Sequence, residues 1–398
     1  MPRLQTLFLA ALLLTACGDS NTTNQPAAPA ASPATPAATT TNVDSDDIAG
    51  TVTGPNGPEA GVWVIAETDD LPTLYSKTVV TDDNGRYLIP DLPAAQYAVW
   101  VRGYGLVDSP RTNAEPGQTL DLDAVIAPDA LAAAAYYPAG YWYSLLEIPE
   151  ASEFPGTGND GNGISPNIHN QADWVRRVSS GGCLACHQLG NAATRTMPNL
   201  FNGYDTSVEA WNRRVQSGQA GGSMVGGLAA MGERSVQLYA EWTDRIAAGE
   251  LPPVPARPSG LERNVVITQW DWADPRAYLH DLVSTDRRDP TVNAYGKLYG
   301  ALENSADYLP VLDPQTHAIS QVPVFPEDPN YNPEPDPPMA ASPYWGDEPI
   351  WDTSTTVHNP MMDSAGRVWI TSRARDPGNV PAYCQQGSDH PSAQVFPL

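Results

Sequence analysis

The stretch GGCLACHQLG at residues 181–190 places two cysteines three positions apart, with a histidine directly after the second. Cys183, Cys186 and His187 allow three interpretations: binding of one iron cofactor, a redox-active dithiol, or half of a zinc site. A zinc site needs two further Cys or His ligands, and a thioredoxin-type dithiol lies at the start of a helix that follows a strand. The surroundings of the motif therefore decide among the three.

Helical signals lie on both sides of the motif. Asn170–Asp173 resembles a capping box, and the helix that it begins should end at Gly181. Downstream, a second helix begins at Thr206 or Ser207, and a third covers about 233–248. The apolar faces of these three helices are expected to consist of Trp174, Val175 and Val178; of Val208, Trp211 and Val215; and of Val236, Tyr239, Thr243 and Ile246.

These surroundings favour an iron cofactor. A helix and not a strand precedes the motif, which disfavours the dithiol. No second CxxC and no HxxxH follows, so a zinc ion would lack its remaining ligands. In a haem site each cysteine adds across one vinyl group, and His187 directly after the second cysteine can ligate the iron from the proximal side.

A helix before CxxCH, an intervening segment and a final helix after a methionine-containing loop together resemble the class I cytochrome c domain over about residues 170–251. The resemblance implies an all-α domain at 167–252 that holds one covalent haem c. Cys183 and Cys186 are then the attachment residues and His187 is the proximal ligand. An export signal at the N-terminus agrees with the haem assignment, because c-type cytochromes receive their haem outside the cytoplasm.

The sixth iron ligand must come from elsewhere in the chain, and a thioether ligand would raise the reduction potential and suit electron transfer. Met224 lies in the glycine-rich segment GQAGGSMVGG, an expected loop whose position resembles that of the distal methionine in cytochromes c. Met231 is the alternative, although it nearly touches the last helix. Met197 follows His187 by only ten residues, a short reach to the far face. His169 is a further candidate, and an open site would suit gas or peroxide chemistry.

The N-terminus has the pattern of an export signal at residues 1–17. One early cation precedes an apolar run at 7–14 that is too short to cross a bilayer, and Leu14–Cys17 resembles the lipobox of bacterial lipoproteins. The resemblance implies a lipidated Cys17 and an exported, membrane-anchored protein facing the periplasm or the cell surface. A simple secretory signal is the alternative, and the choice of membrane stays open. Residues 18–47 follow as a Pro-, Ala- and Thr-rich tether.

Residues 48–128 alternate short β-branched and aromatic runs with turn signals at 54–57 and 82–85, a pattern that indicates a small antiparallel sandwich. The motifs GTVT, VWV and TDDNGRYLIPDLP also resemble the carboxypeptidase regulatory-like, or transthyretin-like, domain. These are packing and turn motifs, so the resemblance implies a scaffold and no catalysis. A bridging segment rich in tyrosine and glycine occupies 129–166.

Residues 262–398 return to a β pattern in NVVITQWDW, YLPVLDPQTHAISQVPV and DSAGRVWITSR. A turn that leads into VWIT is similar to blades of β-propellers of the streptogramin-lyase type. At about 40–50 residues a blade the segment supplies roughly three, whereas propellers close with at least four. We therefore expect an incomplete propeller in a truncated chain, with Cys384 separated from any partner. The histidines of this segment show no ligand spacing: His280, His317, His358 and His390.

The expected fold class is multidomain, with a β-sandwich, an all-α cytochrome c-like domain and an incomplete all-β, propeller-like segment. A net charge of -25 opposes binding to nucleic acid and favours a redox partner with a basic patch. We expect haem binding and electron transfer. Two alternatives stay open: a haem-containing dehydrogenase or lyase whose active site lies in the propeller, and a surface binding module. Whether the chain is itself an enzyme is open.

The lipid anchor generates the first testable prediction. Cys17→Ser removes the thiol that receives the lipid, so this variant should remain unprocessed and should incorporate no labelled palmitate, whereas Cys384→Ser should incorporate as much label as the wild type. Gel autoradiography of the purified proteins is the measurement. A wild-type protein that is exported without label contradicts the anchor and leaves a plain secretory signal.

Overall fold

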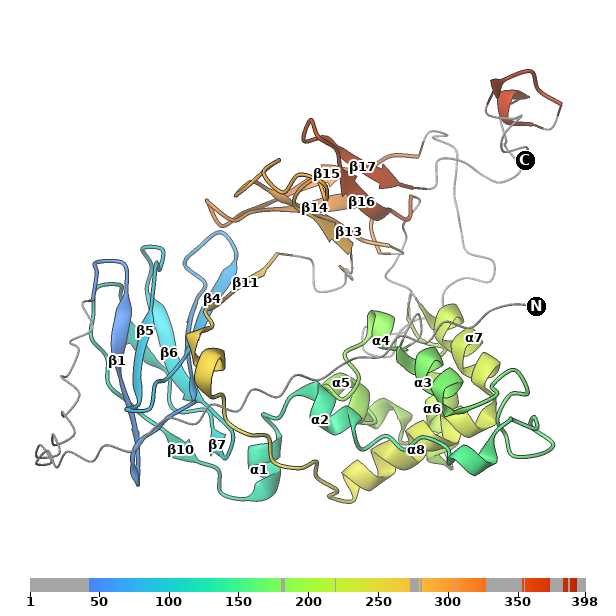
Figure 1. Ribbon diagram of the computed structural model, residues 1–398, viewed down its shortest axis with the longest axis horizontal. Coiled ribbons are helices and arrows are strands. Elements are labelled where there is room, and N and C mark those ends of the chain that lie inside the picture. Colours follow the sequence, from blue (N-terminus) through green and yellow to red (C-terminus); the bar gives the residue numbers. More distant parts are fainter. Residues whose placement is uncertain are drawn as a thin grey trace, which may run out of the picture. The chain divides into compact units, whose positions relative to one another are not determined.

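The computed structural model describes residues 43–179, 183–218, 220–272, 279, 281–303, 305–326, 353, 355–372, 382–385 and 387–391 (Figure 1). The predicted signal peptide, the lipidation site Cys17 and the tether up to residue 42 lie outside these ranges. His280 also lies outside them.

The first folded unit is a β-sandwich. One sheet has the order β2-β1-β5, with β9 paired in parallel to β1, and the other has the order β11-β4-β3-β6-β8. Strands β7 and β10 form a separate antiparallel pair. The strands are β1 (Ile48–Gly54), β2 (Gly57–Pro58), β3 (Trp63–Thr68), β4 (Leu74–Val80), β5 (Arg86–Ile89), β6 (Tyr97–Arg102), β7 (Leu106–Val107), β8 (Thr112–Ala114), β9 (Leu122–Asp123), β10 (Val125–Ile126) and β11 (Ile267–Asp271).

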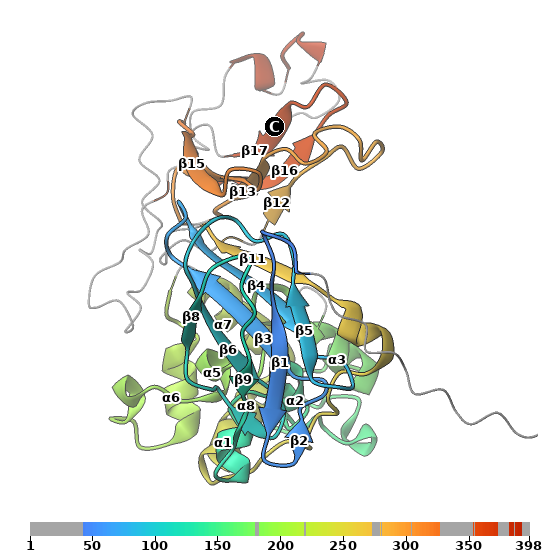
Figure 2. The ribbon, with the colours of Figure 1, turned by 90° about the vertical axis from the view of Figure 1, so that its left-hand side faces the viewer.

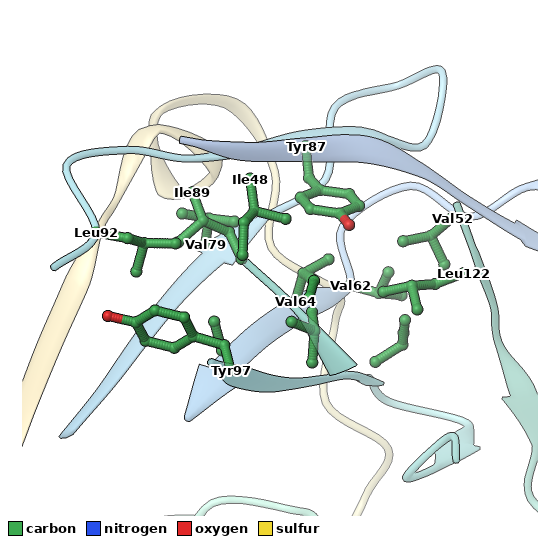
Figure 3. Close-up of a cluster of buried hydrophobic side chains, with 14 of the residues drawn as sticks. Ile48, Val52, Val62, Val64, Val79, Tyr87, Ile89, Leu92, Tyr97 and Leu122 are labelled. Atoms are coloured by element: carbon green, nitrogen blue, oxygen red, sulfur yellow. The ribbon is translucent and has the colours of Figure 1, made fainter. Parts of the chain in front are cut away.

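The core of the sandwich is formed by apolar side chains from both sheets (Figure 3). Alternate residues of β5 and β6 point inward, as the period of two in a half-buried strand predicts. The buried phenols of Tyr87 and Tyr97 each donate to a backbone carbonyl oxygen, and burial raises the pKa of both. The core residues include Ile48, Val52, Val62, Val64, Val79, Tyr87, Ile89, Leu92, Tyr97, Val99, Val101 and Leu122.

Both predicted turns of the sandwich are present. Gly54 pairs with Gly57 at the end of the β1–β2 hairpin. In the second turn the carboxylate of Asp82 accepts hydrogen bonds from the backbone N–H groups of Asn84 and Arg86, at 2.8 and 2.9 Å. Gly85 has φ of 71°, a left-handed conformation that glycine adopts without strain. Turn chemistry in the sequence therefore located these connections correctly.

Strand β11 belongs to the sandwich and not to the C-terminal β segment. The segment NVVITQWDW does form a strand, but assigning it to the C-terminal β segment is wrong, because β11 pairs antiparallel with β4 at the edge of the sandwich (Figure 2). The returning chain is tied there by Arg257, whose guanidinium donates to Glu59 at 2.5 Å and to the carbonyl of Tyr104 at 3.1 Å. The helical region, residues 130–247, is thus inserted between strands β10 and β11 of the sandwich. A linear search for domain boundaries does not detect such an insertion.

The inserted region contains eight described α-helices (Figure 1). They are α1 (Ala130–Ala134), α2 (Ala139–Tyr143), α3 (Gln171–Ser179), α4 (Cys183–Cys186), α5 (Ala192–Arg195), α6 (Ser207–Arg214), α7 (Gly221–Met231) and α8 (Glu233–Ala247). Short 3₁₀ turns cover Ala151–Glu153 and Asn199–Phe201 in this region. Two more lie outside it, Gly260–Asn264 before β11 and Ala382–Cys384 after β17. Ile164 and Ile168, from the expected bridging segment, are fully buried with residues of α3 and α8, so that segment contributes to the helical core.

The three predicted helices correspond to α3, α6 and α8. Thr206 caps α6 in a capping box with Glu209, which decides between the two cap candidates named from sequence. In α3 the side chain of Asn170 accepts from the N–H of Asp173 at 2.9 Å, as expected. Val175 was expected on the apolar face of α3, but it is 40 % exposed. Its position one residue after the buried Trp174 turns it away from the core.

The C-terminal strands form one four-stranded antiparallel sheet in the order β12-β13-β14-β15 and one hairpin of β16 and β17. Their bounds are β12 (Asp281–Val283), β13 (Leu298–Ala301), β14 (Tyr308–Asp313), β15 (Ala318–Pro323), β16 (His358–Met362) and β17 (Val368–Thr371). The up-and-down order of the sheet is that of a propeller blade. Among the described residues the strands do not close into a ring, so the propeller itself stays a prediction.

The placement of β11 generates a stability prediction. Trp270 is partly buried against the sandwich core, where its ring meets Tyr75 edge to face at 5.8 Å, and it also stacks on His317, so Trp270→Ala should lower the free energy of unfolding by about 2 kcal/mol. Ile267→Ala, at a position 45 % exposed on the same strand, should cost about 0.5 kcal/mol or less. Urea denaturation is the measurement, and equal losses for the two variants would contradict the assignment of β11 to the sandwich.

Candidate functional site

The CLAC segment forms a single helical turn, α4, after α3. The N–H of His187 donates to the carbonyl of Cys183 at 2.9 Å, which extends this turn by one residue. Residues four apart in a helical turn lie on one face, so Cys183 and His187 are neighbours on the same side. The structure therefore brings these two predicted site residues together. The backbone of Cys186 belongs to the same turn, and its side chain lies outside the described atoms.

His187 lies at the surface of the helical region. Its side chain is exposed, yet the surrounding protein removes enough water to lower the pKa of the imidazole. The positive charge of Arg214 lowers this pKa further. A neutral imidazole is the form that ligates a metal, so the local electrostatics favour ligation at neutral pH.

Arg214 also holds the loop that follows the motif. Its guanidinium donates to the carbonyl of Thr196 at 2.9 Å and to the carbonyl of Ala193. The same guanidinium lies over the ring of Trp211, 4.6 Å from the ring centre. The loop that carries Met197 is therefore fixed next to the residue whose charge acts on His187. Arg214 was not singled out from sequence, where an arginine at the end of α6 reads as an ordinary solvent-facing cation.

Cys183 contacts a buried tyrosine of α8. Its side chain is half-buried, and its Sγ accepts a hydrogen bond of 3.3 Å from the hydroxyl of Tyr239. Burial, followed by the proximity of Cys183, raises the pKa of Tyr239 well above its ordinary value. Burial and the same cysteine also raise the pKa of Tyr143. Both phenols stay neutral at neutral pH, and Tyr239 remains a hydrogen-bond donor.

Aromatic side chains of α6 and α8 form one wall of the site. The rings of Trp211 and Tyr239 are 5.2 Å apart and inclined by 32°, and Tyr239 also meets Trp242 edge to face at 6.3 Å. The indole of Trp211 donates to Thr243 at 3.0 Å, and that of Trp242 donates to the carbonyl of Trp142 at the same distance. These buried hydrogen bonds fix the orientation of the wall.

The segment around Met224 is a second correction. The glycine-rich sequence was expected to be a loop, but residues Gly221–Met231 form the helix α7. Packing outweighs the low helix propensity of glycine here, because α7 buries Leu228 and Met231 against α8. Met224 lies in the first half of this helix and Met231 is its last residue.

The three methionine candidates share one apolar cluster with Cys183. Met231 is only 2 % exposed and is fully surrounded by protein. Met197 and Met224 are half-buried, as are Cys183 and Leu184. We refer to these half-buried side chains, together with the exposed His187, as the accessible edge of the cluster.

The four other described histidines have their contacts outside this cluster. His169 is exposed next to α3. His317 accepts from the indole of Trp270 at 3.0 Å, and His358 is 2.9 Å from the carboxylate of Asp281. His390 packs on Tyr383. None of the printed contacts of these four described histidines involves His187, and the side chain of Cys384 lies outside the described atoms.

The chemistry of the described side chains is compatible with a haem. A covalently held haem needs thiols beside a histidine, an apolar lining and a sulfur or nitrogen donor on the other side. The accessible edge supplies a thiol at Cys183, an imidazole at His187 and thioethers at Met197 and Met224. Within the described part of the chain no three His, Cys, Asp or Glu side chains gather to hold a metal ion. A haem needs no such group, since the macrocycle supplies four ligands.

Comparison with known proteins identifies the first unit. A family model of the carboxypeptidase regulatory-like domain matches residues 47–127. The match lies within one residue of the boundaries expected from sequence. The carboxypeptidase regulatory-like domain is therefore the scaffold into which the helical region is inserted. No curated protein matches the chain. Within the described residues no helix has the length and apolar character needed to cross a bilayer.

Proposed function

We propose that this chain is a c-type cytochrome that transfers electrons through one covalent haem c held by residues 167–252. Cys183 and Cys186 form the two thioether links, and His187 is the proximal ligand. The observation that carries the proposal is the position of Cys183 and His187, on one helical turn at the accessible edge of an aromatic core that also contains methionines. When bound, the haem supplies an iron that accepts and returns one electron.

Met224 is the distal ligand in this proposal. A side chain that faces a cofactor is partly accessible in the protein alone, and Met224 fulfils this condition. Met231 does not, because protein atoms already enclose it. Met197 belongs to the loop that Arg214 holds beside His187, which argues for the proximal side of the iron. Met231 remains the alternative that the experiment below distinguishes.

The charge distribution supports a redox partner with a basic patch. The net charge of the chain is -25, yet residues 167–252 contain equal numbers of basic and acidic side chains. The acidic field therefore comes from the rest of the chain. Such a field steers a basic partner toward the protein at low ionic strength, and salt should slow that encounter.

The proposal places the protein outside the cytoplasm. The lipobox at Leu14–Cys17 would anchor it to a membrane, and the tether would carry the folded units away from the surface. The carboxypeptidase regulatory-like domain serves as a scaffold. The C-terminal strands are the start of a β-propeller, supported by their up-and-down order.

Covalent attachment is the central experimental prediction. Protein expressed in a periplasm that contains the haem-attachment machinery should keep a haem-staining band after denaturation and acid-acetone extraction. Cys183→Ala and Cys186→Ala should each weaken the linkage, whereas Cys384→Ala should leave it unchanged. Extraction of all haem from the wild type into the acid-acetone would contradict the c-type assignment.

The distal ligand is tested by spectroscopy. Met224→Ala should abolish the weak charge-transfer band of a methionine-ligated ferric haem and lower the reduction potential, because a thioether favours the ferrous state. Met231→Ala is the matched control and should keep the band. If the two variants behave in the opposite way, Met231 is the ligand. A high-spin wild type would contradict methionine ligation altogether.

A further inference from the structure

The hydroxyl of Tyr239 has a weak partner for a buried phenol. In the sandwich, Tyr87 and Tyr97 donate to carbonyl oxygens at 2.7 and 2.9 Å. Tyr239 is 4 % exposed, and its O–H donates to the Sγ of Cys183 at 3.3 Å. Sulfur is a poor acceptor compared with a carbonyl oxygen. In the described part of the chain this is the one hydrogen bond that the hydroxyl makes, so its desolvation is compensated by that sulfur alone.

The ring of Tyr239 cannot turn away easily from this sulfur. Trp211 lies against it at 5.2 Å and Trp242 at 6.3 Å, both from neighbouring positions of the aromatic wall. Thr243, one turn further along α8, accepts from Trp211, and its hydroxyl lies within hydrogen-bond distance of the carbonyls of Ala240 and Tyr239, at 3.0 and 3.2 Å. The hydroxyl is therefore held in one direction by packing on several sides.

We infer that Tyr239 is a positioning residue of the haem site, which fixes the Cys183 sulfur and tunes the reduction potential through the O–H···S hydrogen bond. The part that concerns the potential rests on the proposed function, because the sulfur is then one of the two thioether sulfurs on the edge of the macrocycle. The hydrogen bond itself is independent of that proposal. Tyr239 touches neither the iron nor its ligands in this account.

The direction of the effect follows from electrostatics. The donor end of the O–H dipole points at a sulfur that is bonded to the macrocycle, and reduction places one more electron on the iron and its surroundings. A fixed positive dipole end in a buried site stabilises the more electron-rich state. Removing the hydroxyl should therefore make reduction less favourable and leave the axial ligands unchanged.

The first test measures the reduction potential of Tyr239→Phe in the full chain by spectroelectrochemistry. The equilibrium constant for reduction should fall about threefold, equivalent to about 28 mV for one electron. The bands that report the axial ligands should stay in place. Tyr143→Phe is the matched control, since this tyrosine lies near the same cysteine without a hydrogen bond to its sulfur among the described contacts. Its potential should match that of the wild type.

The second test is a double-mutant cycle on the thermal unfolding of the purified full chain, followed by helical circular dichroism. In the wild-type background, Tyr239→Phe removes a hydrogen bond and should lower the unfolding temperature. In the Cys183→Ala background the hydroxyl has already lost its acceptor. The same substitution then removes an unsatisfied buried donor and should raise the unfolding temperature. A role of the ring in packing alone gives the same sign in both backgrounds.

The outcomes separate this inference from the proposed function. A wild type without covalent haem overturns the cytochrome proposal. The hydrogen bond is then still tested by whether Tyr239→Phe changes the unfolding temperature in opposite directions in the two backgrounds. A wild type with haem whose potential is unchanged by Tyr239→Phe overturns the tuning role. An equal effect of Tyr239→Phe on unfolding in both backgrounds overturns the positioning role.

Discussion

The hydrogen bond from Tyr239 on α8 to Cys183 on α4 is the first constraint on the geometry of the site. It fixes one end of a helical turn against the longest helix of the region, and the turn then presents His187 on the same side, at the surface. Arg214 anchors the following loop, and its charge adds to the effect of burial in lowering the pKa of the His187 imidazole. The accessible edge therefore combines the thiol of Cys183 and the imidazole of His187 with the thioethers of Met197 and Met224. An ordinary helical core has no such combination of groups.

The second constraint is the insertion of the helical region into the carboxypeptidase regulatory-like domain. The chain leaves the sandwich after β10 and returns to it as β11, where Arg257 binds Glu59 and five residues pair with β4. Both ends of the helical region are therefore attached to one folded scaffold. A domain attached at both ends loses less freedom on folding than one on a single linker, because its ends are already close together. The sandwich therefore reduces the chain entropy that the helical region loses on folding.

Local signals in the sequence predicted local structure well. The turn at Asp82–Gly85, the cap at Thr206 and the extent of α8 all depend on neighbours within a few residues, and each is present.

Long-range pairing was not predictable in the same way. The strand NVVITQWDW was recognised, but its partner β4 lies almost 200 residues away, and nothing in an edge strand specifies that partner. The helix α7 was missed because glycine signals a loop, while the burial of Leu228 and Met231 decides the structure. At the candidate site, Cys183 and His187 were predicted from a spaced motif, whereas the contacts of Tyr239 and Arg214 are tertiary and leave no pattern in the sequence.

The proposed haem would be bonded to the turn that carries Cys183, Cys186 and His187. Intact-mass spectrometry of the denatured, purified chain measures this attachment. We expect a mass that exceeds that of the processed polypeptide by one haem, with the added mass on the peptide that contains Cys183 and Cys186 after digestion. A chain at the mass of the bare polypeptide, made beside a cytochrome c that does receive its haem in the same cells, would contradict it.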